Sequence, residues 1–182
     1  RVGDLAETLE VMADFTDLKS PWTRAHSRNV ADLAAAAGML AGMGDEVEML
    51  RFAGLAHDIG RVGVESGIWD KPGPLSTDEW EKVRLHPYLT ERILSRCESL
   101  RPVAAIAARH HERNDGTGYH ARLEASQLSP AALILGAADV CVALKSDRPH
   151  RPAYTPDQAE NLMSDEVERG RLDRWAAEHV MA

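Results

Sequence analysis

The chain of 182 residues has few cysteines, few aromatic residues and no long apolar run. Two cysteines, Cys97 and Cys141, are too few for a disulfide framework, so we expect both to be buried free thiols in a reducing cytoplasm. No apolar stretch approaches the roughly 18–20 residues that a membrane span needs. Residues 1–10 carry both charge signs and show no secretory signal. These absences predict a cytoplasmic protein without membrane association.

The chain also lacks an excess of positive charge. Its 21 basic residues are outnumbered by 29 acidic ones, which gives a net charge of −8. Nucleic-acid surfaces are bound through an excess of Lys and Arg, so we expect no direct nucleic-acid binding by this chain. A local pair of metal ions can nevertheless attract a phosphodiester to an acidic protein.

Alternating, strand-like runs are scarce, whereas helical periodicity is frequent, so the sequence predicts an all-α bundle with one core. We expect helices over residues 4–19, 23–40, 46–58, 77–85, 87–96, 100–111, 130–144, 156–168 and from 172 to the end. Ser76 and Glu79 have capping-box spacing, and the prolines of Lys71–Pro74 exclude regular helix there. The segment Asp115–Gly118 predicts a turn whose two glycines are able to take positive φ.

Histidine and aspartate residues interrupt the apolar faces of these expected helices. His26 precedes Val30 at a spacing of four, and Asp139 follows Leu135 at the same spacing, so each points where the apolar residues point. The candidates are His26, His57, Asp58, His86, His110, His111 and Asp139.

Each of these residues taken alone is readily explained as an ordinary core residue with a backbone partner. Five histidines and two aspartates in one dry core would together need many partners, at about 1–3 kcal/mol for each one missing. A metal cluster satisfies them all, and helical bundles build dinuclear sites in this way. Imidazole mixed with carboxylate suits iron, manganese or zinc better than calcium.

Two motifs in the chain are similar to those of a known family. His57-Asp58-Ile59-Gly60-Arg61 resembles the HDIGK motif of HD-domain phosphohydrolases. The run from His110 to Tyr119, HHERNDGTGY, resembles the HHExxDGxGYP motif of the HD-GYP subfamily, and the resemblance extends from Trp22 to Pro152. It implies an HD-domain bundle of about five core helices that hydrolyses cyclic di-GMP to pGpG or GMP with two divalent metal ions, iron or manganese, with zinc also compatible.

The resemblance also implies a role for each candidate residue. His26, His57, Asp58 and Asp139 match the ligands of a first metal, His86, His110 and His111 those of a second, and Asp58 the bridging carboxylate. Arg61, at the family's Lys position, is expected to act with Asp58 in catalysis. Residues expected to bind substrate are Arg61, Tyr119, Arg148 and Arg151; a solvated loop is the alternative for the last two. Some relatives bind a third metal through a Glu four residues before the first His, but Trp22 stands there, so we expect two metals.

Three positions depart from the family pattern: His120 replaces the Pro of GYP, Thr90 the Gly after the HP pair, and Val142 an Asp near the last ligand. None removes an expected ligand, so a metal-dependent phosphodiesterase is the leading hypothesis. A catalytically weak or inactive module that binds a nucleotide or a partner protein in a larger signalling or transcription regulator is the alternative. A phosphohydrolase of another nucleotide is the third hypothesis.

We expect one domain over 1–182, with a leading helix (1–20), a metal-binding core (21–147) and C-terminal helices (148–182). The chain begins with Arg, which leaves open that it is a fragment of a longer bacterial protein. It resembles actinobacterial regulators that continue into a LuxR-type DNA-binding domain at the C-terminus. The sequence leaves a homodimer open.

Overall fold

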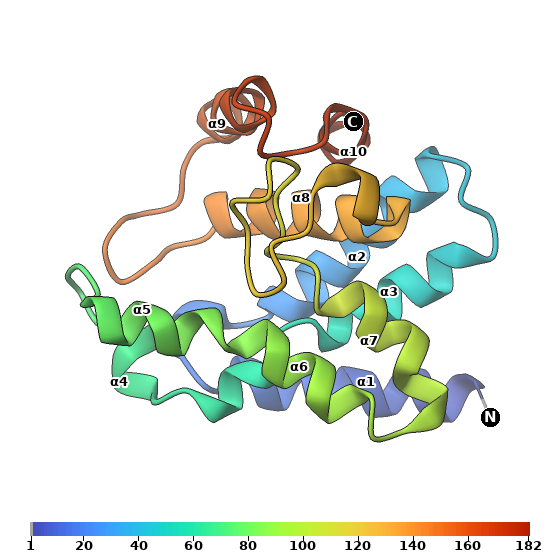
Figure 1. The fold of residues 1–182 in the computed structure, drawn as a ribbon, viewed down its shortest axis with the longest axis horizontal. Coiled ribbons are helices and arrows are strands. Elements are labelled where there is room, and N and C mark those ends of the chain that lie inside the picture. Colours follow the sequence, from blue (N-terminus) through green and yellow to red (C-terminus); the bar gives the residue numbers. More distant parts are fainter. Residues whose placement is uncertain (1) are drawn as a thin grey trace.

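A computed structural model describes residues 2–182, which form helices joined by short 3-10 turns and loops, without a strand (Figure 1). The α-helices are α1 (Val2–Asp17), α2 (His26–Leu40), α3 (Glu46–Ala56), α4 (Ser66–Trp69), α5 (Thr77–Arg84), α6 (His86–Leu94), α7 (Arg101–Ala107), α8 (Pro130–Leu144), α9 (Pro156–Glu168) and α10 (Arg174–Met181). The 3-10 helices are η1 (Pro21–Thr23), η2 (Ile59–Gly63), η3 (Glu98–Leu100) and η4 (Ala125–Gln127).

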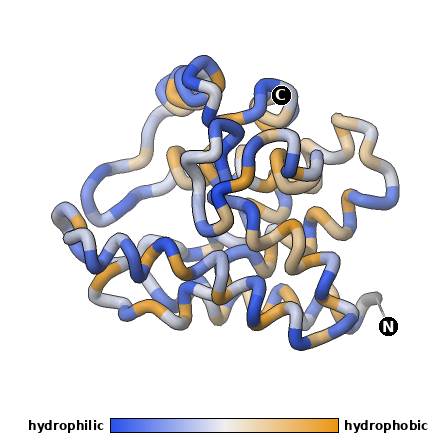
Figure 2. Tube along the Cα trace, in the orientation of Figure 1, coloured by the Kyte–Doolittle hydropathy of each residue, from blue (hydrophilic) through white to orange (hydrophobic). Residues whose placement is uncertain are grey.

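Helix α8 lies at the centre of the bundle. It is apolar on nearly all sides, which is typical of a helix surrounded by others. α2 and α7 pack against one side of α8, and α9 and α10 cover the other. α1 and α6 lie on the opposite side of the molecule from α9 and α10 (Figure 1). The hydropathy colouring in Figure 2 shows apolar residues recurring along these central helices.

The core is built largely from alanine and leucine, which lets the helices approach closely. The approach of α2 to α3 depends on Gly54, because a Cβ there would lie 2.5 Å from the Cα of Ala31. This close packing brings the start of α2 next to the end of α3, where several of the candidate residues lie.

Most of the expected elements are present. The bounds of α8 and α9 are those predicted, and Ser76 and Glu79 form the predicted capping box at the start of α5. Helix α7, however, ends at Ala107, four residues before the predicted end, and α4 was not predicted because four residues carry too little periodicity.

Three further predictions can be compared with the structure. Cys141 is buried as expected, but the prediction was wrong for Cys97, which is exposed beyond the end of α6. Gly116 has the expected positive φ of 72°. Gly118 serves instead for close approach, since a Cβ there would lie 2.5 Å from the Cα of Glu112. No helix among residues 2–182 is long and apolar enough to cross a membrane.

Candidate metal centre

The seven candidate residues come together from five parts of the chain. His26 begins α2, His57 and Asp58 follow α3, His86 begins α6, His110 and His111 follow α7, and Asp139 lies in α8. All are buried except His111, which is partly buried. The predicted convergence of these side chains is therefore present in the structure.

One group of side chains lies between α2, α3 and α8. His26 Nε2 is 3.1 Å from Asp139 Oδ1, and His57 Nε2 is 3.8 Å from the same oxygen. Asp58 Oδ2 approaches both imidazoles, at 3.8 Å from His26 Nε2 and 3.5 Å from His57 Nε2. One ligand atom each from His26, His57 and Asp139 lies within 4.8 Å of the others, which is close enough to hold one ion.

A second group lies beside the first. His86 Nε2 and His110 Nε2 are 3.2 Å apart, and Asp58 Oδ1 is 3.2 Å from the first and 3.6 Å from the second. His111 joins these two histidines in a set that is also compact enough for one ion. The two oxygens of the Asp58 carboxylate thus face different groups of imidazoles.

Backbone carbonyls determine which imidazole nitrogen faces the cluster. The Nδ1 atoms of His57, His86 and His110 lie 2.7, 2.6 and 2.6 Å from the carbonyl oxygens of Gly54, Val83 and Ala107. A carbonyl only accepts, so each Nδ1 carries the proton and Nε2 is the nitrogen that faces the cluster. When such a ring is neutral, as a metal ligand must be, Nε2 presents its lone pair there.

The facing lone pairs fit bound cations. Two neutral rings that both present lone pairs cannot hydrogen bond to each other, yet His86 Nε2 and His110 Nε2 are in contact distance. His57 Nε2 is buried without a hydrogen-bond partner among the described residues. Carbonyl bonds of this kind also orient histidine ligands in metal sites. The residues present therefore suit a metal-binding cluster.

Electrostatics keep the cluster in its ligating form. Burial alone would raise the pKa of Asp58, but nearby positive charge, first of all that of the Arg61 guanidinium, outweighs burial and holds that pKa well below its usual value. Burial is likewise outweighed at Asp139, where the hydrogen bond from His26 contributes most to lowering the pKa. Burial lowers the pKa of His110 to about 3, and it lowers that of His111 as well. Both carboxylates are thus ionised and both histidines neutral at pH 7.

Arg61 is held at the edge of the cluster by two contacts. Its Nη1 donates to Asp58 Oδ2 at 2.8 Å, and its guanidinium lies over the Trp69 ring at 4.0 Å from the centroid. No role was predicted for Trp69, because the short helix α4 that carries it was itself not predicted.

Thr90 acts as a clamp between α6 and η2. Its buried hydroxyl donates to the carbonyl of His57 at 2.8 Å and accepts from the amide of Gly60 at 3.0 Å. The two elements are so close that a Cβ on Gly60 would lie 1.9 Å from the carbonyl oxygen of His86. The sequence marked Thr90 as a departure from the family pattern, and only the structure shows what its hydroxyl contacts.

A cavity of about 660 Å³ opens over the cluster. Five of the seven candidates line it: His26, Asp58, His86, His111 and Asp139. Arg61, Tyr119 and Arg148 line it as well. The guanidinium of Arg148 forms no hydrogen bond or ion pair with any described residue, and burial lowers its pKa. Burial, followed by the Asp139 carboxylate, raises the pKa of Tyr119, so its hydroxyl stays protonated.

Arg151 is the one expected substrate-binding residue that does not line this cavity. Its guanidinium donates to the carbonyls of Ala143 at 2.8 Å and Leu144 at 3.3 Å, which caps the end of α8. It also lies over the ring of Tyr154. His120 likewise lies outside the cavity, at 3.4 Å from Glu91 Oε2, and Val142 packs in the core.

This chain belongs to the HD domain family, whose model matches residues 10–175. It is 39% identical over 84% of its length to 3'3'-cGAMP-specific phosphodiesterase 3 of Vibrio cholerae serotype O1 and covers 34% of that protein. It is 33% identical over 91% of its length to the cyclic di-GMP phosphodiesterase response regulator RpfG of Xanthomonas campestris pv. campestris, of which it covers 44%.

The fold is shared with a solved structure. Bd1817, a HDG"Y"P protein from Bdellovibrio bacteriovorus, superimposes with a TM-score of 0.72 at 17% identity, over 100% of this chain and 63% of that one. The predicted HD-GYP resemblance and all-α HD-domain fold are confirmed. The chain spans less than half the length of the two curated relatives described here.

Proposed function

We propose that this domain hydrolyses a phosphodiester bond of a cyclic dinucleotide with the help of two bound divalent metal ions. The first ion would be held by His26, His57, Asp58 and Asp139, and the second by His86, His110, His111 and Asp58. The observation that supports this best is the Asp58 carboxylate, whose two oxygens face two separate groups of imidazoles. The identity of the metals is proposed to be iron or manganese, with zinc also compatible with these ligands.

The chemistry follows from the residues around the cluster. When bound, a pair of divalent ions supplies a nucleophile at neutral pH and offsets charge on the phosphoryl oxygens. Arg61 and Arg148 would bind the non-bridging phosphate oxygens, because arginine stays protonated and matches their geometry. The protonated hydroxyl of Tyr119, at the cavity wall, would donate a hydrogen bond to the substrate.

The proposed substrates are cyclic di-GMP and 3'3'-cGAMP, on which the relatives' names report activity. A weakly active or inactive binding module is the second candidate. Val142 favours it, because this residue packs in the core and offers no polar group near the cluster. The domain limits, a further DNA-binding domain and a homodimer stay predictions.

The test begins with elemental analysis of anaerobically purified protein, for which we expect about two ions per chain. The loaded protein is then given cyclic di-GMP and 3'3'-cGAMP, and linear dinucleotide or mononucleotide is measured. Tight binding of a cyclic dinucleotide without product would favour the binding module. Product formed only from other nucleotides would favour a phosphohydrolase of another nucleotide.

Asp58→Ala should lose both bound metal and turnover, because the carboxylate between the two imidazole groups is gone. Asp32→Ala is the matched control, since Asp32 is an exposed aspartate on α2. Full activity with full metal content in the Asp58 variant would refute the proposed site.

A further inference from the structure

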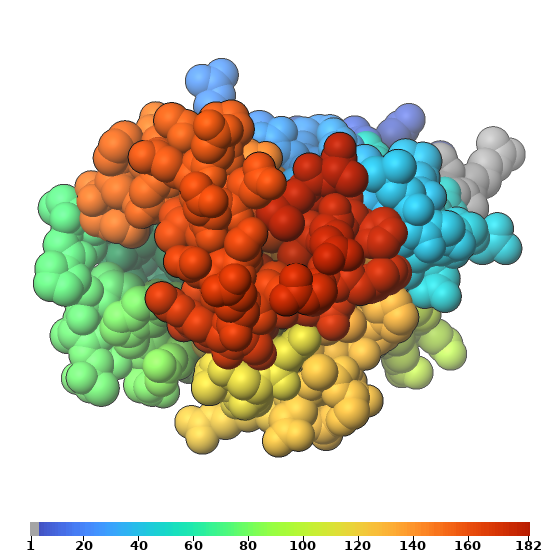
Figure 3. Space-filling model, turned by 90° about the horizontal axis from the view of Figure 1, so that it is seen from above, coloured from blue at the N-terminus to red at the C-terminus, as the bar shows by residue number. Residues whose placement is uncertain are grey.

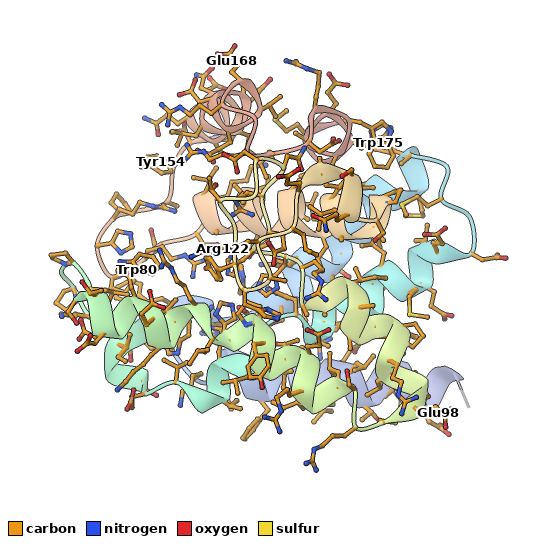
Figure 4. The ribbon with its side chains drawn as sticks, in the orientation of Figure 1. Trp80, Glu98, Arg122, Tyr154, Glu168 and Trp175 are labelled. Atoms are coloured by element: carbon orange, nitrogen blue, oxygen red, sulfur yellow. The ribbon has the colours of Figure 1, made fainter. Side chains whose placement is uncertain are left out.

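Aromatic residues are scarce in this chain, and they are not spread evenly. The sequence has four tryptophans, three tyrosines and two phenylalanines. Three of the four tryptophans, Trp22, Trp69 and Trp80, line the cavity over the histidine and aspartate cluster. The fourth, Trp175, lies on α10 at the other end of the molecule from Trp80 (Figure 4).

Two of the three indoles in the cavity lack an aromatic or cationic partner among the described residues. Trp69 already contacts the Arg61 guanidinium at 4.0 Å from its centroid and the His86 ring at 5.6 Å. Trp22 and Trp80 have no ring or cation contact with any described residue, and they are 38% and 45% exposed. Large apolar side chains exposed at a cavity are typical of a binding surface.

The backbone at Trp22 and at Trp80 is held by hydrogen bonds. Trp22 lies in η1, where its amide donates to Ser20 Oγ at 3.3 Å, and the Ser20 hydroxyl in turn donates to Asp70 at 2.5 Å. Trp80 directly follows the capping box formed by Ser76 and Glu79 at the start of α5. The backbone that carries each indole is therefore already ordered, which lowers the entropic cost of binding a ligand.

The cavity changes character from its floor to its rim. The imidazoles and carboxylates of the cluster make the floor polar, whereas Trp22, Trp80, Pro72 and Pro74 make the rim apolar. The Lys71 ammonium at the rim is paired with Glu79 at 2.6 Å. The rim lies where the α4–α5 region meets the α8–α9 connection (Figure 3). Trp80 lies on the side of α5 next to that connection (Figure 4).

A cyclic dinucleotide has the same division, with charged phosphates in its ring and two flat bases outside it. Bases stack on aromatic side chains, and stacking tolerates any base because every base has a π-face. We propose that Trp22 and Trp80 form a nucleobase-stacking subsite for the bases of a cyclic dinucleotide whose phosphate lies over the cluster. This inference depends on the proposed function, to which it adds how the bases of the substrate are recognised.

The proposal predicts a loss of substrate binding rather than of the chemical step. Trp22→Ala and Trp80→Ala should each raise KM by about 5- to 150-fold, the range expected for one lost stack, with kcat within about threefold of wild type. Cyclic di-GMP and 3'3'-cGAMP should be affected alike. Phenylalanine at either position keeps a stacking face and should restore most of the loss.

The experiment compares metal-loaded wild type with Trp22→Ala, Trp80→Ala and Trp175→Ala. Trp175 is the matched control, because it is 36% exposed and lies outside the cavity. Binding of a phosphorothioate analogue of cyclic di-GMP, which resists hydrolysis, is measured by quenching of tryptophan fluorescence. Inorganic phosphate, which carries no base, is measured as a competitive inhibitor, and its inhibition constant should be the same in all four proteins.

The outcomes separate this inference from the proposed function. Turnover of cyclic dinucleotides by wild type, with KM unchanged in Trp22→Ala and Trp80→Ala, would overturn the stacking subsite and leave the proposed function standing. An equal rise in KM for Trp175→Ala, or weaker inhibition by phosphate in the cavity variants, would overturn it too. A wild type that neither binds nor hydrolyses any cyclic dinucleotide would overturn the proposed function itself.

Discussion

Replacing Thr90 by valine removes one hydroxyl group from the clamp between α6 and η2. Valine has nearly the same shape as threonine, so the substitution leaves no cavity. The carbonyl of His57 and the amide of Gly60, however, would each lose a partner inside the protein. The carbonyl belongs to His57, which directly precedes Asp58. The Thr90 hydroxyl holds this carbonyl and the Gly60 amide against α6, the helix that begins with His86.

The expected loss of stability follows from these two groups. A buried donor or acceptor without a partner costs about 1–3 kcal/mol, so the free energy of unfolding should fall by about 2–6 kcal/mol. A domain of this size has about 5–15 kcal/mol in total. Thr90→Ser keeps the hydroxyl and loses only a methyl group, which costs about 1 kcal/mol. The smaller, more polar serine should therefore be the milder change.

Urea unfolding of the metal-free protein measures these differences directly. Thr16→Val is the matched control, because the Thr16 hydroxyl is also buried but donates only to the carbonyl of Met12 in its own helix, at 2.8 Å. Titration of each variant with Mn²⁺ then tests function. We expect Thr90→Val to bind metal more weakly, since His57 and His86 are held together through the clamp.

A Thr90→Val protein within about 0.5 kcal/mol of wild type would refute this reasoning, as would a serine variant less stable than the valine one. Reduced stability with unchanged metal affinity would show that the clamp supports the fold but does not position the ligands.

Two further predictions concern charge. Arg61→Ala should keep the metals, because all of their proposed ligands remain, and should lower kcat by about 10²–10³-fold, the usual effect of removing one donor to a transition state. Arg61→Lys should lower kcat less. Complete loss of metal in the alanine variant would contradict the proposed role. Stability of the metal-free protein should fall on acidification, because burial lowers the pKa of His110 to about 3. The unfolded chain takes up this proton below about pH 6.5 and the folded one does not, so the free energy of unfolding should fall by about 1.4 kcal/mol per pH unit between pH 6.5 and the folded pKa. Urea unfolding with a chelator at pH 7 and pH 5 checks this, and equal stability at the two values would count against it.

Much of the candidate site could be predicted from the sequence because its signals are local. The identities of the seven residues follow from polar side chains on apolar helical faces, and a capping box or a proline acts within a few residues. The same local signals gave the right bounds for α8 and α9 but extended α7 too far, because the apolar pattern continues to His110 after the helix has ended.

Other features depend on residues far apart in the chain. Cys97 was expected to be buried but is exposed. Arg151 caps α8 through hydrogen bonds to backbone carbonyls that no local sequence pattern predicts. Trp22 and Trp80 belong to separate segments, and only the cavity shows that they line the same space.

The sequence by itself determined the helical class, most helix starts to within two residues, and the chemical types of the clustered side chains, since periodicity and capping act over one or two turns. The tertiary structure alone decided that His26 would meet Asp139 across 113 residues, and that the two oxygens of Asp58 would face different imidazoles. These arrangements depend on how α2, α3, α6 and α8 pack on each other, and that packing is a property of the whole core.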